Sequence, residues 1–444
     1  MQNLKLGTNF TYQNLPNGDF VVYSTNGSAK PFVLTGKARD LFKELVKVTS
    51  SNSENLFREL TYKAMAEEDT KAILAYLETE GIFSNKEFLY PKTNPQKKTK
   101  HLTFWIHITN MCNLRCTYCY IYKNPGEMSK AIIKEILRFL VKEAAEGRLE
   151  TVTLKFGGGE PVLAFALIRY MVNNAKRMLL PKKVKLRFSM ITNGTVLTNE
   201  ICKFLHEEKF TISVSIDGLG NFNNERLYPN GIKSVQESLM GIALLQKHKI
   251  NPYILSVVSN TNVTGLDNLI NYMVSRNLSI NLILCRALDD NGNLILDLDL
   301  MHQELIPILR KIVRVKDDKL PNLTFSTIGL KGRRNRACSG GHTYFVVGHD
   351  GKISTCPMAV GPLEDSSLDI ERDFHSVKAA FYPKERHSAC KTCIWKYACA
   401  GGCDVVAKKS NDTLTPAPLC NIMKPILKEL LFLEGRKIQI SRRR

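Results

Sequence analysis

The sequence predicts an α/β protein built around a partial barrel of six parallel strands, with a small winged-helix-like domain before the barrel and a cysteine-rich domain after it. Strand and helix patterns alternate from Leu102 onward, which is typical of parallel α/β architecture. Residues 1–90 combine a β-rich start with helical periodicity. Ten of the twelve cysteines fall into three spaced groups, which favours metal sites.

The composition describes an ordinary globular chain of 444 residues, 44% hydrophobic and 23% charged, which is long enough for roughly three domains. No apolar run approaches the length needed to cross a bilayer, and the N-terminus has no signal-peptide pattern. We therefore expect a cytoplasmic protein without a membrane partner. In that compartment, spaced cysteines favour metal ligation over disulfide bonds.

The chain carries a net charge of +20. Its Lys and Arg residues are spread along the sequence, with local runs at 97–98, 182–183, 333–334 and 442–444. No basic patch interleaved with aromatic residues accompanies these runs, and no nucleic-acid-binding motif does. We therefore expect a solvated surface and an acidic partner rather than RNA or DNA.

The first domain is predicted to hold a small antiparallel sheet followed by three helices. Two Asn-Gly turns, at 17–18 and 26–27, lie beside β-rich runs. Apolar residues then recur with helical spacing near 41–46, 56–60 and 73–77. This order is typical of a winged helix, which binds DNA, packs on a neighbouring domain or recognises a peptide.

A polar stretch at 91–100, with two prolines and four lysines, is predicted to be a linker. We place the barrel domain at residues 101–320 and the cysteine-rich domain at 321–444. Six runs are predicted as barrel strands: Leu102–Ile108, Thr151–Phe156, Leu186–Ile191, Thr211–Ile216, Tyr253–Val258 and Ile280–Cys285.

Cys112, Cys116 and Cys119 follow the first predicted strand with the spacing C-x3-C-x2-C. Three thiols this close suit a tight loop over one metal centre, and thiolates are the usual ligands of iron–sulfur clusters. A cubane cluster has four irons, so three protein ligands leave one iron open. The alternative is a zinc knuckle, which needs a fourth Cys or His nearby; His101 and His107 lie upstream in a predicted strand.

The second predicted strand runs directly into the segment Gly157-Gly-Gly-Glu-Pro161. Glycine allows the backbone to approach a ligand closely, and Glu160 offers a carboxylate to a cation. Later strand ends present Asn193, Ser215 and Asp217, at the end of a barrel where catalytic residues gather. Asn193 and Asp217 each precede a glycine, so both also fit ordinary turns.

Three further residues of the predicted barrel domain carry a charge or a thiol. Arg286 follows the last predicted strand, where it either meets a carboxylate or forms a surface salt bridge. Cys202 lies in a helical run and is expected to be a small buried hydrophobe. Cys285 lies near the barrel mouth, where it is either another such residue or a functional thiol.

The last third of the chain carries seven cysteines at distinctive spacings. A zinc ribbon would show paired C-x2-C knuckles, and only one such pair occurs here. The pattern reads Cys338-x12-Gly351-x4-Cys356, then Cys390-x2-Cys393-x5-Cys399-x3-Cys403, then Cys420.

The cysteine loop, with Tyr118 before its last cysteine, resembles the signature of the radical S-adenosylmethionine (radical SAM) enzymes. In that family the open iron chelates SAM, and electron transfer releases a 5′-deoxyadenosyl radical. The resemblance implies that Cys112, Cys116 and Cys119 hold the catalytic cluster. It also implies that the cofactor is bound by Tyr118, Gly158, Gly159, Glu160, Asn193 and Ser215, with Glu160 at the methionyl ammonium.

The seven-cysteine pattern resembles the SPASM domain, which follows the barrel in peptide- and protein-modifying radical SAM enzymes. The resemblance implies two auxiliary [4Fe–4S] clusters, hence three clusters in all. One set would be Cys390, Cys393, Cys399 and Cys420, and the other Cys338, Cys356 and Cys403. The fourth iron of the second set would be open to a substrate thiolate or would take another ligand, such as His342.

Residues 1–90 resemble the PqqD-like RiPP recognition element, in which a leader peptide adds as a strand to the sheet edge. The chain as a whole therefore resembles a RiPP-modifying maturase of the sactisynthase or ranthipeptide type. The resemblance implies an oxidoreductase that installs a thioether or carbon–carbon crosslink in a ribosomally made precursor peptide. It also implies an electron donor such as flavodoxin or ferredoxin.

Three alternatives remain open at the level of sequence. Sulfatase maturases also carry SPASM, but they lack the leader-binding module and use an Asp directly after the second cysteine of that domain, where this chain has Pro357. Peptide epimerases need a cysteine hydrogen donor, for which Cys202 and Cys285 are the candidates. The non-enzymatic alternative is a zinc-stabilised scaffold that binds nucleic acid through its positive charge.

Overall fold

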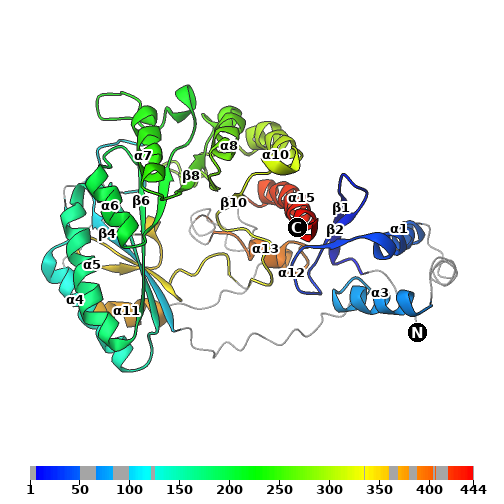
Figure 1. Cartoon of the computed structure of the whole chain (residues 1–444), viewed down its shortest axis with the longest axis horizontal. Helices are drawn as coiled ribbons and strands as arrows, with labels where there is room; N and C mark the ends of the chain where they lie inside the picture. The colour runs from blue at the N-terminus through cyan, green and yellow to red at the C-terminus, as the bar shows by residue number, and fades with distance from the viewer. Residues whose placement is uncertain are drawn as a thin grey trace.

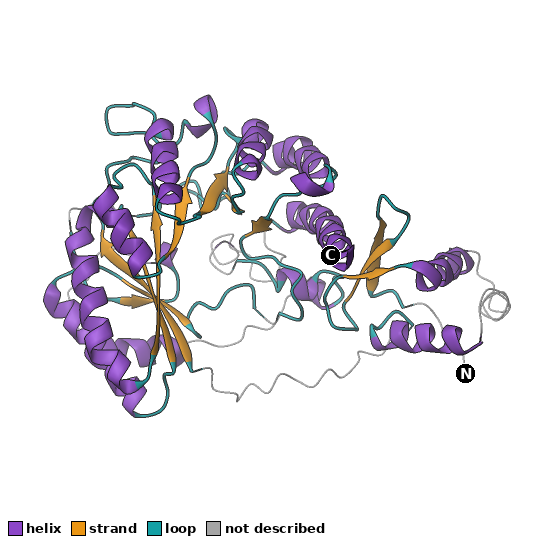
Figure 2. Ribbon diagram, in the orientation of Figure 1, coloured by secondary structure: helices purple, strands orange, loops and turns teal. Residues whose placement is uncertain are grey.

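The computed structural model describes residues 7–50, 67–83, 100–121, 126–334, 336–359, 369–379, 388–403, 406 and 419–443. A barrel-like α/β unit fills one end of the molecule, a small sheet with two helices fills the other, and the C-terminal helix lies between them (Figures 1 and 2). The predicted α/β fold with its partial barrel is confirmed. The predicted helix near 56–60 and the predicted linker up to residue 99 lie outside the described residues.

One nine-stranded sheet forms the barrel, in the order β10-β9-β8-β7-β6-β5-β4-β11-β12. All neighbouring pairs in this sheet are parallel except β11 and β12. The six central strands are the predicted ones: β4 (His101–Thr109), β5 (Thr151–Gly158), β6 (Lys185–Thr192), β7 (Thr211–Ser215), β8 (Tyr253–Val258) and β9 (Ile280–Leu284).

Three strands from later in the chain extend this sheet at both edges. They are β10 (Leu323–Phe325), which pairs with β9, and β11 (Tyr344–Val347) with β12 (Ile353–Ser354), which continue the sheet beyond β4. The sheet therefore continues past residue 320, where the sequence placed the end of the barrel domain. Because β11 pairs with β4, the cysteine-rich region begins beside the strand that leads into the cysteine loop.

Helices cover one face of the sheet and leave the other face to the barrel interior (Figure 1). On β5, Val152, Leu154 and Phe156 are buried in the core shared with these helices, whereas Thr153 and Lys155 on the opposite face are only half-buried. The covering helices are α4 (Lys130–Ala145), α5 (Phe165–Leu179), α6 (Asn199–Glu207), α7 (Val235–Lys247) and α8 (Leu266–Ser275). The short α9 (Leu298–Leu300) and α10 (Ile306–Ile312) follow β9.

The N-terminal region forms a three-stranded antiparallel sheet in the order β1-β2-β3. Its elements are β1 (Phe10–Asn14), β2 (Phe20–Ser24), β3 (Phe32–Leu34), α1 (Gly36–Ser50) and α3 (Glu67–Thr79). Strand β2 is buried along its whole length. Its side chains alternate, so that Phe20 and Val22 join the core beneath α1 while Val21 and Tyr23 face the C-terminal domain.

The N-terminal sheet is packed onto the C-terminal helix α15 (Cys420–Arg443) rather than standing apart from it. A Cβ at Gly435 would lie 2.6 Å from Val21 Cβ, so glycine is what lets helix and sheet approach this closely. The ring of Tyr23 stacks on Trp395, with centroids 5.1 Å apart. The guanidinium of Arg333 donates to the carbonyl oxygens of Thr25, Asn26 and Gly27. The remaining C-terminal helices are α11 (Ile370–Ala379), α12 (Ser388–Lys391) and α13 (Lys396–Cys399).

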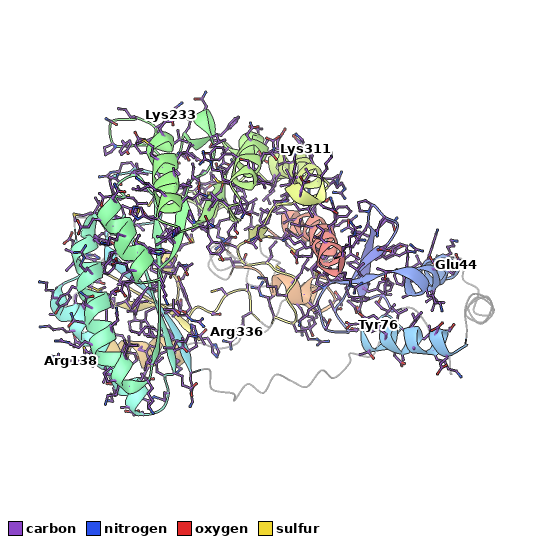
Figure 3. All side chains as sticks on the ribbon, viewed as in Figure 1. Glu44, Tyr76, Arg138, Lys233, Lys311 and Arg336 are labelled. Carbon is purple, nitrogen blue, oxygen red and sulfur yellow. The ribbon has the colours of Figure 1, made fainter. Side chains whose placement is uncertain are left out.

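Basic side chains are dispersed over the surface of the molecule. Arg138 on α4, Lys233 before α7 and Lys311 on α10 are exposed and lie on separate elements (Figure 3). Among the described residues, no helix combines the length and the apolar character that a membrane span requires.

Candidate active site and metal centres

The cysteine loop follows β4 and is held by a second loop, which follows β7. Backbone N–H groups of Arg115 and Thr117 donate to the carbonyl oxygens of Leu227 and Glu225, at 2.6 and 3.1 Å. The carboxylate of Glu225 also accepts a hydrogen bond from the Thr117 hydroxyl at 3.1 Å. The loop thus has a fixed backbone path before any cofactor binds.

The thiols of Cys112, Cys116 and Cys119 are partly buried and lie within electrostatic reach of one another. Burial raises the pKa of Cys112, and the other two thiols and Glu160 raise it further. In the part of the chain that the structure describes, no three His, Cys, Asp or Glu side chains are close enough together to hold a single metal ion. A cubane is bound through separate irons, so its thiolates need not converge on one ion, and three soft sulfur donors fit such a cluster.

Tyr118 anchors the loop between its last two cysteines. Its hydroxyl donates to the carboxylate of Asp217 and accepts a hydrogen bond of 2.7 Å from Nη1 of Arg226. Asp217 and Arg226 are both buried and lie 3.8 Å apart. Burial raises the pKa of Tyr118 well above its ordinary value, so the phenol keeps its proton and remains a donor.

The glycine segment at the end of β5 lies directly against the start of the cysteine loop. A Cβ at Gly159 would lie 2.0 Å from the Met111 carbonyl oxygen, and one at Gly158 would lie 2.3 Å from that of Thr109. Gly158 also has a φ of +115°, which disfavours any L side chain. Backbone N–H groups of Gly159 and Glu160 donate to the Thr109 and Met111 carbonyls, each at 2.8 Å. Only glycine therefore permits this contact.

Glu160 is fully buried beside the cysteine loop and lies near Cys112. Its carboxylate accepts hydrogen bonds from the Thr192 hydroxyl at 2.6 Å, the Asn193 backbone N–H at 2.7 Å and the Val162 backbone N–H at 3.1 Å. Burial raises its pKa, whereas these three donors act in the opposite direction. These hydrogen bonds fix the carboxylate at the strand ends, where it could bind a cationic group of a ligand.

Asn193 and Ser215 take different positions at the strand ends. The Asn193 amide donates to Oδ1 of Asn113 at 2.8 Å, and its own oxygen accepts from Thr195, so this side chain ties β6 to the cysteine loop. Ser215, the last residue of β7, is half-buried and makes no side-chain hydrogen bond within the described residues. Asn193 therefore acts on the loop, while Ser215 remains available to a ligand.

The C-terminal cysteines fall into two groups in space. Cys399 lies near Cys390, Cys393 and Cys420, and burial raises its pKa to about 11. These four thiols line a pocket together with Trp395 and Met423, and Cys403 also reaches the wall of this pocket. Cys356 instead lies near Cys338 and Cys403. The SPASM resemblance implies the same two groups as ligand sets, and their assignment to two clusters stays a prediction.

The group of three cysteines borders the barrel. Tyr120, directly after the cysteine loop, interacts electrostatically with both Cys119 and Cys356. Arg286, at the end of β9, also lies near Cys356. His342, the suggested extra ligand, is exposed, and its charged neighbours are Arg336 and Lys378. The structure thus brings Arg286 towards this group, while the charges beside His342 are basic.

The two remaining cysteines lie in the barrel unit. Cys202 is completely buried on α6, as expected for a packing residue. Cys285 is buried at the end of β9, near the carboxylates of Glu225 and Asp217. Sequence reasoning gave Asp217 little weight and missed Arg226 and Glu225, because no local pattern marks the loop after β7; it also missed Asn113 inside the cysteine loop, whose partner Asn193 is distant in sequence. The only available signal was the run of polar residues that follows Asp217-Gly218.

Comparison with known proteins agrees with this geometry. Residues 106–269 match the sequence model of the radical SAM superfamily. A cysteine-type anaerobic sulfatase-maturating enzyme from Clostridium perfringens is 26% identical over 326 residues, which cover 66% of this chain and 85% of that protein. The superfamily uses a [4Fe–4S] cluster and SAM, so the prediction of these cofactors is confirmed.

Two solved structures share the fold. Native anSMEcpe with bound AdoMet superimposes with a TM-score of 0.62 at 22% identity, covering 77% of this chain and 99% of that one. Streptococcus suis SuiB bound to the precursor peptide SuiA superimposes with a TM-score of 0.51 at 14% identity, covering 93% of this chain and 98% of that one. The second likeness extends over more of this chain than the first.

Proposed function

We propose that this enzyme, whose residues 106–269 form a radical SAM domain, crosslinks a ribosomally synthesised precursor peptide through a thioether or a carbon–carbon bond. The peptide's leader would dock on the N-terminal sheet, and its core would enter the barrel. The observation that carries the proposal is the position of Cys338, Cys356 and Cys403, which border the cysteine loop through Tyr120.

The loop after β4 would hold the first cluster through Cys112, Cys116 and Cys119. When bound, cluster and SAM together supply hydrogen abstraction from a substrate carbon. The chain's own part is to orient them: Glu160, after β5, offers its fixed carboxylate to the methionyl ammonium, and Ser215 offers a hydroxyl from the end of β7. The buried contacts of Tyr118 keep the loop from shifting during turnover.

A crosslink joins two residues with the net loss of two hydrogens. One hydrogen leaves as an atom to deoxyadenosine and the other as a proton, so one electron must be removed from the substrate. A cluster on Cys338, Cys356 and Cys403 would be the nearest acceptor, and one on the other four cysteines would pass the electron outward. A flavodoxin or ferredoxin would exchange electrons with the protein, attracted by its net charge of +20.

β3 is the last strand of the N-terminal sheet, and among the described residues no strand pairs with its outer edge, which would suit an added strand. Thr25 donates to Asn9 and Leu15 donates to Asp19, which fixes the hydrogen-bonded pairs of β1 and β2 and directs the Val21 backbone groups towards β1. Val33, paired with Val21, therefore directs its own N–H and C=O away from β2. These groups are what an incoming leader strand would bond to.

Side chains beside this edge support the same role. The ring of Tyr76, which is 44% exposed on α3, packs edge-on against Phe32 of β3 at 5.7 Å. The guanidinium of Arg442, at the end of α15, donates to the outward Val33 carbonyl at 3.2 Å. An apolar wall and a cation thus flank the outward backbone groups of Val33, and both would contact a bound leader.

The second candidate function is sulfatase maturation, favoured by the 26% identity to the Clostridium perfringens enzyme. Such an enzyme would oxidise one Cys or Ser of a protein rather than join two residues. Pro357 follows Cys356 here, and proline supplies no carboxylate base at that position. The structure of SuiB bound to its precursor peptide covers 93% of this chain. This longer likeness favours a precursor peptide as the substrate.

One experiment separates these functions. The reconstituted enzyme is incubated without oxygen with SAM, a reductant and either the precursor peptide of the adjacent reading frame or a sulfatase-derived peptide, and the products are analysed by mass spectrometry. Crosslinking predicts loss of two hydrogens from the precursor peptide and no reaction with its leaderless form. Conversion of the sulfatase peptide alone would refute the proposal. Alkylating the precursor's cysteines should abolish a thioether and leave a carbon–carbon bond unaffected.

A further inference from the structure

Lys155 and Trp105 form a pair on the inner face of the barrel sheet. They are register partners on β5 and β4, and the Lys155 ammonium lies 4.8 Å from the centre of the Trp105 ring. A cation over an indole ring is attracted by the ring's negative face, which fixes the long lysine side chain. The pair faces the barrel interior, because the alternate β5 residues Leu154 and Phe156 are buried against the helices.

Both residues offer hydrogen-bond donors without acceptors. Among the described residues, no carboxylate pairs with Lys155, and the buried Trp105 Nε1–H has no acceptor. Burial lowers the pKa of Lys155, with no opposing effect from a nearby acid. His107, the next inner residue on β4, has its pKa lowered to about 4 by burial and is neutral near pH 7. A half-buried cation without a counter-ion and a buried N–H without an acceptor are both unfavourable.

The pair lies between the two regions that the reaction requires. A Cβ at Gly157, the first residue of the glycine segment, would lie 2.8 Å from Nε1 of Trp105. On its other side, the Trp105 ring meets Tyr344 edge-on at 6.3 Å, and Tyr344 interacts electrostatically with Cys356 and Cys338. A group bound by Lys155 would therefore sit between the SAM-binding segment and the cysteines nearest the barrel.

We propose that Lys155 and Trp105 form a substrate subsite for a carboxylate, supplied by an Asp or Glu side chain of the peptide close to the residue that is modified. The inference rests on the proposed function in requiring a peptide in the barrel. A carboxylate accepts from both donors at once and neutralises the lysine, whereas an amide oxygen accepts hydrogen bonds but carries no charge to neutralise it. The subsite thereby selects peptides with an acidic residue at one fixed distance from the reacting carbon.

The test combines enzyme variants with a peptide scan. Lys155→Met keeps the length and apolar stem of the side chain but removes its charge, and Lys185→Met on β6 removes an exposed charge from the same sheet as a control. Each acidic residue of the peptide is exchanged in turn for its amide. Peptide affinity without reductant, peptide KM and kcat, SAM KM and SAM cleavage without peptide are all measured.

The proposal predicts that Lys155→Met weakens peptide affinity and raises peptide KM by roughly thirtyfold or more, as for loss of one partner of a buried charge pair. SAM KM and peptide-free SAM cleavage should be unchanged, as should every value for Lys185→Met. One acid-to-amide exchange in the peptide should weaken its binding to the wild-type enzyme as much as Lys155→Met does. The same exchange should cause no further loss of affinity in Lys155→Met.

Two results would overturn the subsite. A raised SAM KM with unchanged peptide affinity would place Lys155 at the cofactor, and additive effects of the enzyme and peptide changes would show no contact between them. If the wild-type enzyme acts only on the sulfatase peptide, the proposed crosslinking fails. In that case the polar residues of the sulfatase peptide are exchanged in turn for Asp or Glu. An exchange that improves binding to the wild-type enzyme but not to Lys155→Met would support the subsite, and the absence of such an exchange would refute it.

Discussion

The Tyr118 hydroxyl accepts a hydrogen bond of 2.7 Å from Arg226 while donating to the Asp217 carboxylate. This contact joins the cysteine loop to the end of β7, across 99 and 108 residues of sequence. All charges in the group are buried and mutually compensated. The loop that would carry the catalytic cluster is therefore positioned by a polar network that lies outside the cysteine motif.

Replacing Arg226 with Met should disorganise the cysteine loop, because the buried Asp217 loses its positive partner. Loss of one partner of a buried ion pair costs about 3–5 kcal/mol. We expect a corresponding fall in the free energy of unfolding, measured by urea denaturation, together with loss of SAM cleavage. Arg138→Met, at an exposed position on α4, is the matched control. Wild-type SAM cleavage in Arg226→Met would show that the network does not position the loop.

Gly159→Ala tests the contact between the glycine segment and the cysteine loop. The new Cβ would lie 2.0 Å from the Met111 carbonyl oxygen, so one of the two backbones must move. Displacement by about an ångström at a reacting centre lowers rates roughly hundredfold, which is the fall we expect in deoxyadenosine formation. Gly329→Ala is the control, since its Cβ meets only Arg334 Nη1 at an ordinary 3.6 Å. Equal activity of the two variants would contradict the prediction.

Leader binding should slow hydrogen exchange at the Val33 amide. Its N–H points away from β2 and would become bonded to an added strand, whereas the Val21 N–H is directed towards β1 in both states. Exchange measured with and without the leader peptide therefore contains its own control. Protection at Val21 alone, or at neither amide, would place the leader elsewhere.

Alkaline pH should destabilise the protein partly through Cys202. Burial raises the pKa of this thiol from 9.0 to about 11, so the folded protein favours the protonated form. Its contribution to stability is complete below about pH 9 and is lost as the pH rises towards 11, by up to about 3 kcal/mol. Urea unfolding at about pH 8 and about pH 10.5 should show a smaller loss in Cys202→Ala than in the wild type. Identical losses would refute the assignment.

Sequence patterns predicted the parts of the molecule whose cause is local. The spacing of Cys112, Cys116 and Cys119 predicted a metal-binding loop, and the alternation of strands and helices predicted the barrel. The glycine segment ending in Glu160 was recognisable because close backbone approach needs glycine. These features depend on residues that are neighbours in the chain.

The parts that could not be predicted depend on contacts between distant segments. In the sequence, Arg226 is one charged loop residue that belongs to no motif. Only the fold shows that it donates a hydrogen bond to Tyr118. Lys155 is one polar residue of an alternating strand, and only the barrel shows that it lies over Trp105 with no acid nearby. In the sequence, Gly435 is only a residue of low helix propensity. The fold shows that it lets the helix approach Val21 closely. Period and spacing alone do not reveal which distant residues meet.

The most direct test of the central claim is the iron content of protein prepared without oxygen. Three cubane clusters predict about twelve irons per chain, falling to about eight when Cys112, Cys116 and Cys119 are all replaced by Ala. Deoxyadenosine formation should vanish in the triple variant. A wild-type content of about four irons, or an unchanged content in the triple variant, would contradict the division of the cysteines into one catalytic and two auxiliary sets.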